Sequence, residues 1–441
     1  MMLNTTHDPG RRSWVVSANA AASDFPIQNL PFGVFRQESN SPRGGVAIGD
    51  RIFDLQAGTV AGLFSGKALK AAVAASEETL NSLLALGHEP ASALRARLSD
   101  LLREDGPDRA EIEGQAKTLL IAQKDVELLL PVAVRQFTDF ATSTYHIGRF
   151  SGYAGHGNPK CPPVFRNLPV AYNSRASSVA VDGTPLIRPN GQWKRKPEES
   201  EPEYGAEPYQ DYELEFGAWY GGQSSTLGEP LPLDEAASHI FGYCLLNDWS
   251  SRGIQFWESM LGPFLGKSAL TTVSPWIVTE EAMAPFRAPA FERHPDDPKL
   301  LDYLRSAADQ REGHLNVELD AFIVTPKMRE QGAAPFQICA SNFKYLYWTF
   351  GQMFTHHMSN GCNMGPGDLI GSGTCSGPGD EMMACLAEKS MLGIKAWPLP
   401  NGEARTYFED GDDVVLRGRA KREGYVSIGF GDCSGRIHPA R

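Results

Sequence analysis

The chain has 441 residues, of which 41% are hydrophobic and 21% are charged, and it contains 44 glycines and 31 prolines. This composition is typical of a folded globular protein rich in turns and strands. The formal net charge of −12 disfavours a nucleic-acid or membrane-surface binder, because an acidic surface repels phosphates. No apolar run approaches the roughly 18 residues of a membrane span, and the amino terminus lacks a secretion signal, so we expect a cytoplasmic protein with a small-molecule partner.

The amino-terminal third predicts a small β-rich module covered by helices. Strand-like patterns occupy residues 25–35 and 45–55, and apolar residues at helical spacing follow over residues 63–102, with a break at residues 87–90. The pattern changes near residue 125. Since single cores usually stop growing at about 250 to 300 residues, we predict two domains, over residues 1–125 and 126–441.

The remaining two thirds predict a mainly β domain. Period-2 alternation indicates strands at residues 211–220, 314–324 and 423–432, and the apolar run at residues 241–248 indicates a buried strand. The charged, proline-containing residues 191–205 predict a solvated loop.

The seven cysteines include no C-x-x-C pair of the kind that binds zinc. Buried thiols are the expected role, because cysteine commonly fills cores. A nucleophilic Cys362 near His356 and His357 is the alternative.

Several acidic residues occupy positions where they could share a metal ion. Glu213 and Glu215 fall on one face of a predicted strand. Asp248 ends a buried strand that opens into a predicted helix, and Asp139 lies between two aromatic residues. For each of them, a solvated, capping or turn position is the plain alternative. If they converge, an all-oxygen set suits a hard cation such as Ca²⁺ or Mg²⁺.

The sequence resembles the fumarylacetoacetases and, more widely, the fumarylacetoacetate hydrolase superfamily, over nearly its whole length. The matching segments are TDF (138–140), RASSV (175–179), ELE (213–215), NDWS (247–250), LGPFLGKS (261–268), SNFKYLYWT (341–349), THHMSNGCN (355–363), GDLIGSGT (367–374) and DGDDV (410–414). The resemblance implies a small amino-terminal SH3-like β-barrel, a large domain folded as the family's mixed β-sandwich roll, and a homodimer.

The resemblance also implies roles for individual residues. The family's metal ligands fall on Asp139, Glu213, Glu215 and Asp248, with Lys267 and Thr271 beside the cation. Its catalytic histidine falls on His146, with Glu388 as the acidic partner. Gln255 and Lys267 match groups that stabilise developing negative charge, and Tyr172, Gln255 and Thr374 match substrate contacts.

These roles are chemically consistent with hydrolysis of a carbon–carbon bond in a small β-diketo acid. A 1,3-diketone can bind a divalent cation through two oxygens, and a neutral His146 oriented by Glu388 can take a proton from water. The expected reaction is hydrolysis of fumarylacetoacetate to fumarate and acetoacetate in tyrosine and phenylalanine catabolism, or cleavage of a related acylpyruvate. The alternatives are a lyase, decarboxylase or hydratase of the same superfamily, and a metal-stabilised binding protein without activity.

Three positions depart from the family's substrate contacts: Ala141, Gly155 and Ser259 stand where the family has a tyrosine, an arginine and a tyrosine. Those residues hold a substrate carboxylate, a task that suits a guanidinium group. We therefore expect altered substrate recognition around the same hydrolytic centre. The candidate replacements for the missing arginine are Arg149, His156, Arg166 and Arg252.

Overall fold

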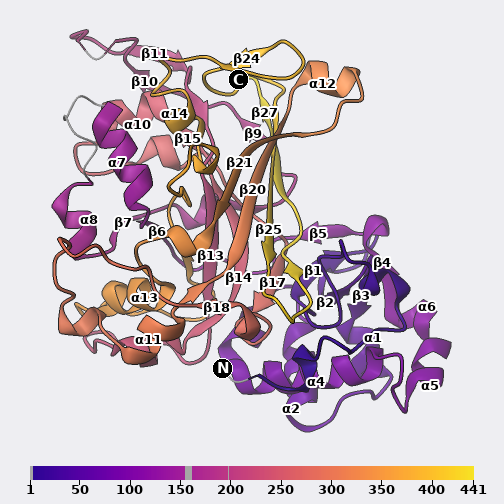
Figure 1. The fold of residues 1–441 in the computed structure, drawn as a ribbon. Coiled ribbons are helices and arrows are strands. Elements are labelled where there is room, and N and C mark those ends of the chain that lie inside the picture. Colours follow the sequence, from indigo (N-terminus) through magenta and orange to yellow (C-terminus); the bar gives the residue numbers. More distant parts are fainter. Residues whose placement is uncertain (1–2, 154–160, 197) are drawn as a thin grey trace.

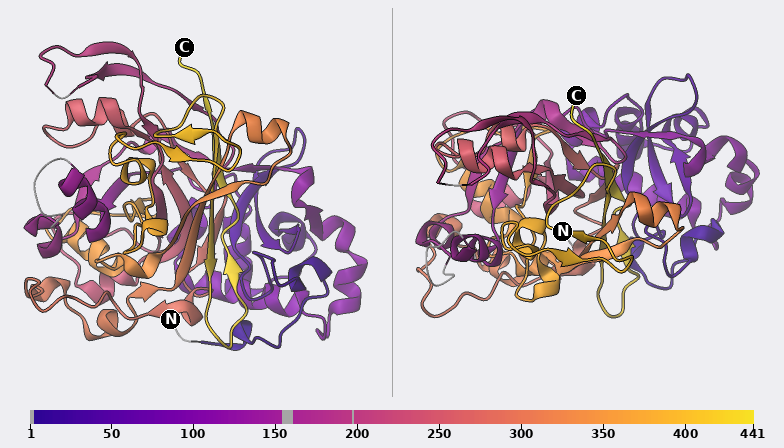
Figure 2. Two further views of the ribbon diagram at one scale, coloured as in Figure 1. Left: turned by 45° about the horizontal axis from the view of Figure 1, so that its top comes forward. Right: turned by 90° about the horizontal axis from the view of Figure 1, so that it is seen from above.

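The computed structural model describes residues 3–153, 161–196 and 198–441 as a strand-rich α+β fold (Figure 1). Within these residues, one sheet of 13 strands and one of six strands form the body of the protein, and four two-stranded sheets lie at its margins. A mixed, strand-rich architecture was expected from the sequence. Figure 2 shows the amino-terminal part lying to one side of the larger carboxy-terminal part.

The first two strands of the amino-terminal part form a hairpin, and its last strand pairs back onto that hairpin. β1 pairs with both β2 and β5, β2 pairs with β3, and β3 pairs with β4. Their bounds are β1 Phe32–Arg36, β2 Arg43–Ile48, β3 Arg51–Asp54, β4 Leu120–Ala122 and β5 Glu127–Leu129. The strand predicted over residues 45–55 is thus two strands, because Gly49 adopts a φ of 57° and turns the chain. The strand predicted from residue 25 begins only at Phe32.

Helices cover this sheet through alanine- and leucine-rich faces. They are α1 Leu55–Val60, α2 Gly66–Ala75, α3 Asn81–Leu86, α4 His88–Leu102, α5 Arg109–Gly114 and α6 Ala116–Leu119. The predicted break lies at Gly87, whose φ of 72° separates α3 from α4. Pro90 lies in the first turn of α4, where the missing N–H costs no helical hydrogen bond.

The described strands of this part do not close into a barrel, since β4 and β5 lie at separate ends of the pairing. The SH3-like barrel is therefore not confirmed. Strand β5, which follows residue 125, pairs with β1, so the sheet of this part continues past the predicted boundary. The division into residues 1–125 and 126–441 stays a prediction.

Strand β17, Trp276–Thr279, connects the two parts into one sheet. It pairs with β1 on one side and with β14 on the other. The order β4-β3-β2-β1-β17-β14-β13-β22-β6-β7 then runs without interruption from the amino-terminal hairpin to the far edge. The other strands of this sheet are β6 Phe137–Ala141, β7 Val170–Asn173, β8 Val179–Val181, β13 Leu214–Tyr220, β14 Ile240–Asp248, β16 Thr271–Val273 and β22 Leu369–Gly371.

The six-stranded sheet packs against β13 and β14 around the main hydrophobic core. Phe216 and Leu245 from the first sheet meet Leu319 and Leu416 from the second. The strands of the second sheet are β9 Leu186–Ile187, β20 Val317–Val324, β21 Phe336–Asn342, β25 Asp413–Ala420, β26 Ile428–Gly429 and β27 Cys433–His438. Two sheets whose apolar faces meet in this way form a sandwich.

Short pairs and helices surround the sandwich. The pairs are β10 Asn190–Trp193 with β11 Glu203–Ala206, β12 Gln210–Asp211 with β15 Ser250–Ser251, β18 Arg287–Ala288 with β19 His314–Leu315, and β23 Trp397–Pro398 with β24 Ala404–Arg405. The helices are α7 Thr144–Tyr153, α8 Pro163–Asn167, α9 Leu233–Ala237, α10 Arg252–Glu258, α11 Ala307–Glu312, α12 Pro326–Glu330, α13 Phe350–Met358 and α14 Leu386–Lys389. None of the helices in the described ranges is long and apolar enough to cross a membrane.

The predicted strands of the large part fared unequally. Strand β14 and the alternating burial of β20 confirm two of them. The strand predicted at residues 423–432 is wrong, because Gly424 and Gly431 adopt φ angles of 83° and 73° and leave only β26 between them. The solvated loop predicted at residues 191–205 is a projecting hairpin with strands at both ends, β10 and β11 (Figure 1).

Gly44 on β2 provides a test of the packing between helices and sheet. A Cβ atom at this position would lie 1.7 Å from the carbonyl oxygen of Ala75, the last residue of α2. We expect Gly44→Ala to lower the free energy of unfolding by about 1 to 3 kcal/mol, as overpacking usually does. Gly114→Ala is the control, because a Cβ there meets nothing within 4 Å. Equal urea midpoints for the two variants would contradict the packing described here.

Candidate active site

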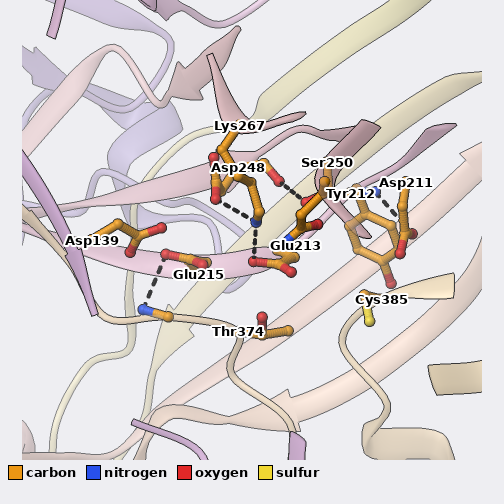
Figure 3. A network of polar contacts seen from close by, with 12 residues as sticks. Asp139, Asp211, Tyr212, Glu213, Glu215, Asp248, Ser250, Lys267, Thr374 and Cys385 are labelled. Atoms are coloured by element: carbon orange, nitrogen blue, oxygen red, sulfur yellow. Dashed lines mark hydrogen bonds and ion pairs between the residues drawn. The ribbon is translucent and has the colours of Figure 1, made fainter. Parts of the chain in front are cut away.

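Three carboxylates from strands β6, β13 and β14 of the large sheet converge at one point (Figure 3). Asp139 on β6, Glu215 on β13 and Asp248 at the end of β14 each place a carboxylate oxygen within 4.8 Å of the others. All three side chains are buried. Gly371 on β22 makes room for them, since a Cβ there would lie 2.3 Å from Oδ1 of Asp139.

This cluster has the properties of a site for a hard cation. One oxygen of each residue is buried without a hydrogen-bond partner among the described residues: Oδ1 of Asp139, Oε1 of Glu215 and Oδ1 of Asp248. Burial and the neighbouring Asp248 raise the pKa of Asp139 well above its ordinary value. Burial, Asp139 and Asp248 do the same to the pKa of Glu215. Carboxylate oxygens that lack donors and share a small space fit a divalent cation such as Ca²⁺ or Mg²⁺.

Glu213, the fourth predicted ligand, has a different set of partners. It lies just before β13, and its two oxygens face Lys267 Nζ at 2.7 Å and Arg252 Nη1 at 2.7 Å. Burial alone would raise the pKa of Glu213, but Lys267 and Arg252 hold it well below its ordinary value. The structure therefore brings Asp139, Glu215 and Asp248 together and places Glu213 beside them as part of an ion-pair network.

Lys267 links the two groups of acids. Its Nζ donates to Oδ2 of Asp248 at 2.6 Å and to Oε2 of Glu213 at 2.7 Å. Although burial favours the neutral amine, these two carboxylates raise the pKa of Lys267 and keep it charged. Thr271 on β16 lies directly opposite Asp248 in the sheet. Its place beside a cation stays a prediction.

Tyr172 on β7 closes another side of the cluster. Its hydroxyl lies 3.0 Å from Oδ2 of Asp139 and 2.7 Å from Oδ2 of Asp248. Burial and these two acids raise the pKa of Tyr172 well above its ordinary value, so the hydroxyl stays protonated and acts as a donor. Tyr172 also lines the adjoining cavity.

His146 and Glu388 form a hydrogen-bonded pair in the same region. Nδ1 of His146, on α7, lies 2.7 Å from Oε1 of Glu388, on α14. Burial alone would raise the pKa of Glu388, but His146, the Ser376 hydroxyl and Arg149 hold it below its ordinary value. An ionised Glu388 accepts a hydrogen bond from the Nδ1–H group of His146, which leaves Nε2 as the nitrogen that can accept a proton.

A cavity of about 660 Å³ connects the histidine with the acids. Its polar lining includes Asp139, His146, Tyr172, Asn173, Glu213, Arg252, Gln255, Lys267 and Thr374. Apolar side chains form the remaining walls, among them Ile147, Phe150, Phe165, Val170, Phe256 and Leu261. Nε2 of His146 lies 3.4 Å from Oγ1 of Thr374 within this lining.

Gln255 reaches the cavity from α10. The buried carboxylate of Glu207 caps the start of this helix. It accepts hydrogen bonds from the backbone N–H groups of Gly253 and Ile254 at 2.9 Å each. Nη1 of Arg252 donates to Oε1 of Gln255 at 3.1 Å, which leaves the amide N–H groups of Gln255 available to the cavity.

Comparison with known proteins identifies the origin of this arrangement. The family described as "Fumarylacetoacetase N-terminal" matches residues 28–131, and "Fumarylacetoacetate (FAA) hydrolase C-terminal" matches residues 146–438. The chain is 44% identical to the fumarylacetoacetase of Oryza sativa subsp. japonica over 96% of both chains. It is 42% identical to the fumarylacetoacetase of Bos taurus, over 96% of this chain and 98% of that one.

This chain belongs to the fumarylacetoacetase family. A solved structure, the fumarylacetoacetate hydrolase of Exiguobacterium antarcticum, is 16% identical, with a TM-score of 0.49, over 93% of this chain and 100% of that chain.

The residues that depart from the fumarylacetoacetase pattern lie in different surroundings. Ala141, at the end of β6, lines the cavity. Ser259 follows α10, where its hydroxyl donates to the carbonyl of Phe256 at 3.3 Å. Gly155 and His156 lie outside the described residues. Altered substrate recognition stays a prediction.

The three other candidate replacements for the family's arginine already have carboxylate partners. Arg149 contacts Glu388 at 2.9 Å and Arg166 contacts Asp297 at 3.1 Å. Arg252 lies 2.9 Å from Asp211 and 2.7 Å from Glu213. Only Arg252 among these three lines the cavity.

The sequence analysis also considered the cysteines and the two histidines near Cys362. His356 and His357 contact the side chains of Tyr303 and Thr138 at 3.0 and 2.9 Å. Every cysteine except Cys362 is buried, as expected.

Sequence reasoning missed two groups that complete the site. Ser376, two residues after Thr374, donates to Oε1 of Glu388 at 2.5 Å. Asp211 accepts from Nε of Arg252 at 3.0 Å. Asp211 alternates with Glu213 and Glu215 along the sequence, and this spacing was the available signal; Ser376 had none beyond its proximity to Thr374.

Removing a carboxylate from the cluster should weaken metal binding directly. For Glu215→Gln we expect Ca²⁺ and Mg²⁺ affinity to fall by more than the roughly 10- to 100-fold that loss of an outer partner costs. Isothermal titration calorimetry of the metal-free protein measures this. Asp320→Asn on β20, remote from the cluster, is the control and should bind as the wild type does. Undiminished binding by Glu215→Gln would remove Glu215 from the coordination shell.

Proposed function

We propose that this chain hydrolyses a carbon–carbon bond of a β-diketo acid, converting fumarylacetoacetate and water to fumarate and acetoacetate, or cleaving a closely related acylpyruvate. One observation carries the proposal: His146, which is hydrogen-bonded to Glu388, and Asp139 of the acidic cluster line the same cavity. The identity of 42–44% with fumarylacetoacetases over nearly the whole chain supports it.

His146 acts as the general base. Because Nδ1 donates to Glu388, Nε2 takes a proton from a water molecule in the cavity, and the hydroxide oxygen adds to the substrate carbonyl carbon. The bond to the neighbouring carbon then breaks, and the proton held by His146 is available for that carbon. Thr374, at 3.4 Å from Nε2, is placed to orient the water or the substrate.

Lys267 and Gln255 stabilise negative charge on the attacked oxygen. An ammonium group has three N–H donors, and Lys267 uses two of them on Asp248 and Glu213. The third N–H and the amide of Gln255 remain for the substrate. Donors fixed in advance in this way are each typically worth about 3 to 4 kcal/mol of transition-state stabilisation.

Asp139, Glu215 and Asp248 would hold the divalent cation, with Glu213, Lys267 and Thr271 around them. We propose Ca²⁺ or Mg²⁺, because every donor in the cluster is an oxygen. When bound, the cation supplies Lewis-acid polarisation of the diketone oxygens. The homodimer and the cytoplasmic location stay predictions.

Labelled water distinguishes hydrolysis from the alternatives. With metal-loaded enzyme and fumarylacetoacetate in H₂¹⁸O, we expect one solvent oxygen in the new carboxylate, since hydroxide becomes part of the product. Mass spectrometry of the products measures the label. A lyase or decarboxylase would release product without it, and an inert binding protein would release none.

His146→Ala tests the assignment of the base. We expect kcat to fall by about 100- to 10,000-fold, the usual contribution of a positioned acid or base. Metal affinity should stay unchanged, because His146 is not part of the acidic cluster. His294→Ala, an exposed histidine, is the control. Unchanged turnover by His146→Ala would show that this histidine is structural.

A further inference from the structure

Arg149 binds Glu388, the acid that is hydrogen-bonded to His146. Its Nη1 donates to Oε2 of Glu388 at 2.9 Å, on the oxygen opposite the one that His146 uses. Its Nη2 is anchored by backbone carbonyls, those of Gly377 at 2.9 Å, Pro378 at 3.3 Å and Gly379 at 3.1 Å. The guanidinium group thus joins Glu388 to the loop that precedes α14.

We propose that Arg149 is a positioning residue for the proposed hydrolysis, fixing the Glu388 carboxylate in the orientation that holds His146 for proton transfer. The inference rests on the proposed function. Arg149 itself does not line the cavity, so it acts through Glu388 and does not touch the substrate.

The position of Arg149 on α7 explains why this contact matters. Residues three apart in a helix lie on the same face, so His146 and Arg149 both extend towards α14. They bind the two oxygens of one carboxylate, at 2.7 and 2.9 Å. Both oxygens of Glu388 are therefore bound by side chains of α7. These two contacts fix the plane of the carboxylate relative to the imidazole ring.

The two oxygens of Glu388 differ in their other partners. Oε1 accepts from Ser376 at 2.5 Å and from Sγ of Cys385 at 3.5 Å, in addition to His146. Arg149 is the partner of Oε2 among the described residues. The Glu388 side chain is fully buried, so removing Arg149 takes the charged donor away from Oε2. His146 and Ser376 still bind Oε1, but they do not fix Oε2, so the plane of the carboxylate can change relative to the imidazole ring.

Arginine suits this role better than lysine. A planar guanidinium group can serve Glu388 through one nitrogen and several carbonyls through another, whereas a lysine ammonium is a compact charge on a flexible stem. Arg149→Lys should keep the charge beside Glu388 but lose the fixed angle, and it should have activity between that of the wild type and that of Arg149→Ala.

The test compares Arg149→Ala and Arg149→Lys with a matched control, all as metal-loaded enzymes. Arg329 is the control, because it also joins one carboxylate, Asp413, to the backbone carbonyls of Val324 and Gly411, but on α12. We expect Arg149→Ala to lower kcat by about 10- to 100-fold with KM within about twofold of the wild type. Arg329→Ala should change neither constant beyond that margin.

Two readouts separate positioning from a general structural role. Guanidinium chloride at millimolar concentration should restore part of kcat to Arg149→Ala and none to His146→Ala. In a Glu388→Gln background, loss of Arg149 should add little to the loss already present, because the two residues act as one unit.

The outcomes also separate this inference from the proposed function. A wild type that fails to hydrolyse the diketo acid overturns both. An active wild type with a fully active Arg149→Ala overturns only the role of Arg149. A rise in KM at unchanged kcat would make Arg149 a substrate contact, and full additivity with Glu388→Gln would make it a structural tie; either result contradicts the proposal.

Discussion

The candidate active site depends on how the buried negative charge of the acidic cluster and Glu213 is balanced. Asp139, Glu213, Glu215 and Asp248 lie together out of water, and the cationic side chains in contact with them are Lys267 and Arg252, the second of which also serves Asp211. Carboxylates at such a density cannot all remain ionised without further positive charge. The oxygens without donors fall on Asp139, Glu215 and Asp248, where a cation would supply that charge. Lys267 and Arg252 balance Glu213, Lys267 also faces Asp248, and a cation would balance the charge that remains on Asp139, Glu215 and Asp248.

The sequence predicted which acidic residues lie in this centre better than it predicted the partners of each one. Alternation along residues 211–220 placed Glu213 and Glu215 on one face, and the apolar run before Asp248 marked a buried strand correctly. Convergence of these residues with Asp139 depends on which strands are neighbours in the sheet, a long-range property that came only from the family resemblance. The contrast between Glu213 and Glu215 was not predictable, because it depends on where Lys267 and Arg252 reach across from a separate turn and helix.

Local structure was predicted least well where glycine conformations decide it. Gly49 divides one predicted strand into a hairpin, and Gly424 and Gly431 reduce another to the two residues of β26. Alternating side chains favour a strand in each case, but a positive φ ends it, and composition alone does not tell which glycine adopts one. The sequence could not separate the candidate roles of Arg149 for a related reason. A free guanidinium group near a substrate pocket and one that holds a neighbouring carboxylate look alike in a sequence, and only the contacts of Glu388 distinguish them.

The amino-terminal part also covers strand β17 of the large sheet. This strand is short, and its outer side is covered by β1, where Phe32 and Gly33 face Ile277 and Trp276. Gly33 allows the ring of Trp276 to lie against the backbone, since a Cβ there would come within 2.5 Å of the ring. Without β1, strand β17 would be an edge strand with unpaired backbone amides and an exposed Trp276 indole. Exposed sheet edges of this kind pair with other chains. The amino-terminal part therefore covers the edge of this sheet, and the carboxy-terminal part expressed without it would be prone to self-association even if its acidic cluster were intact.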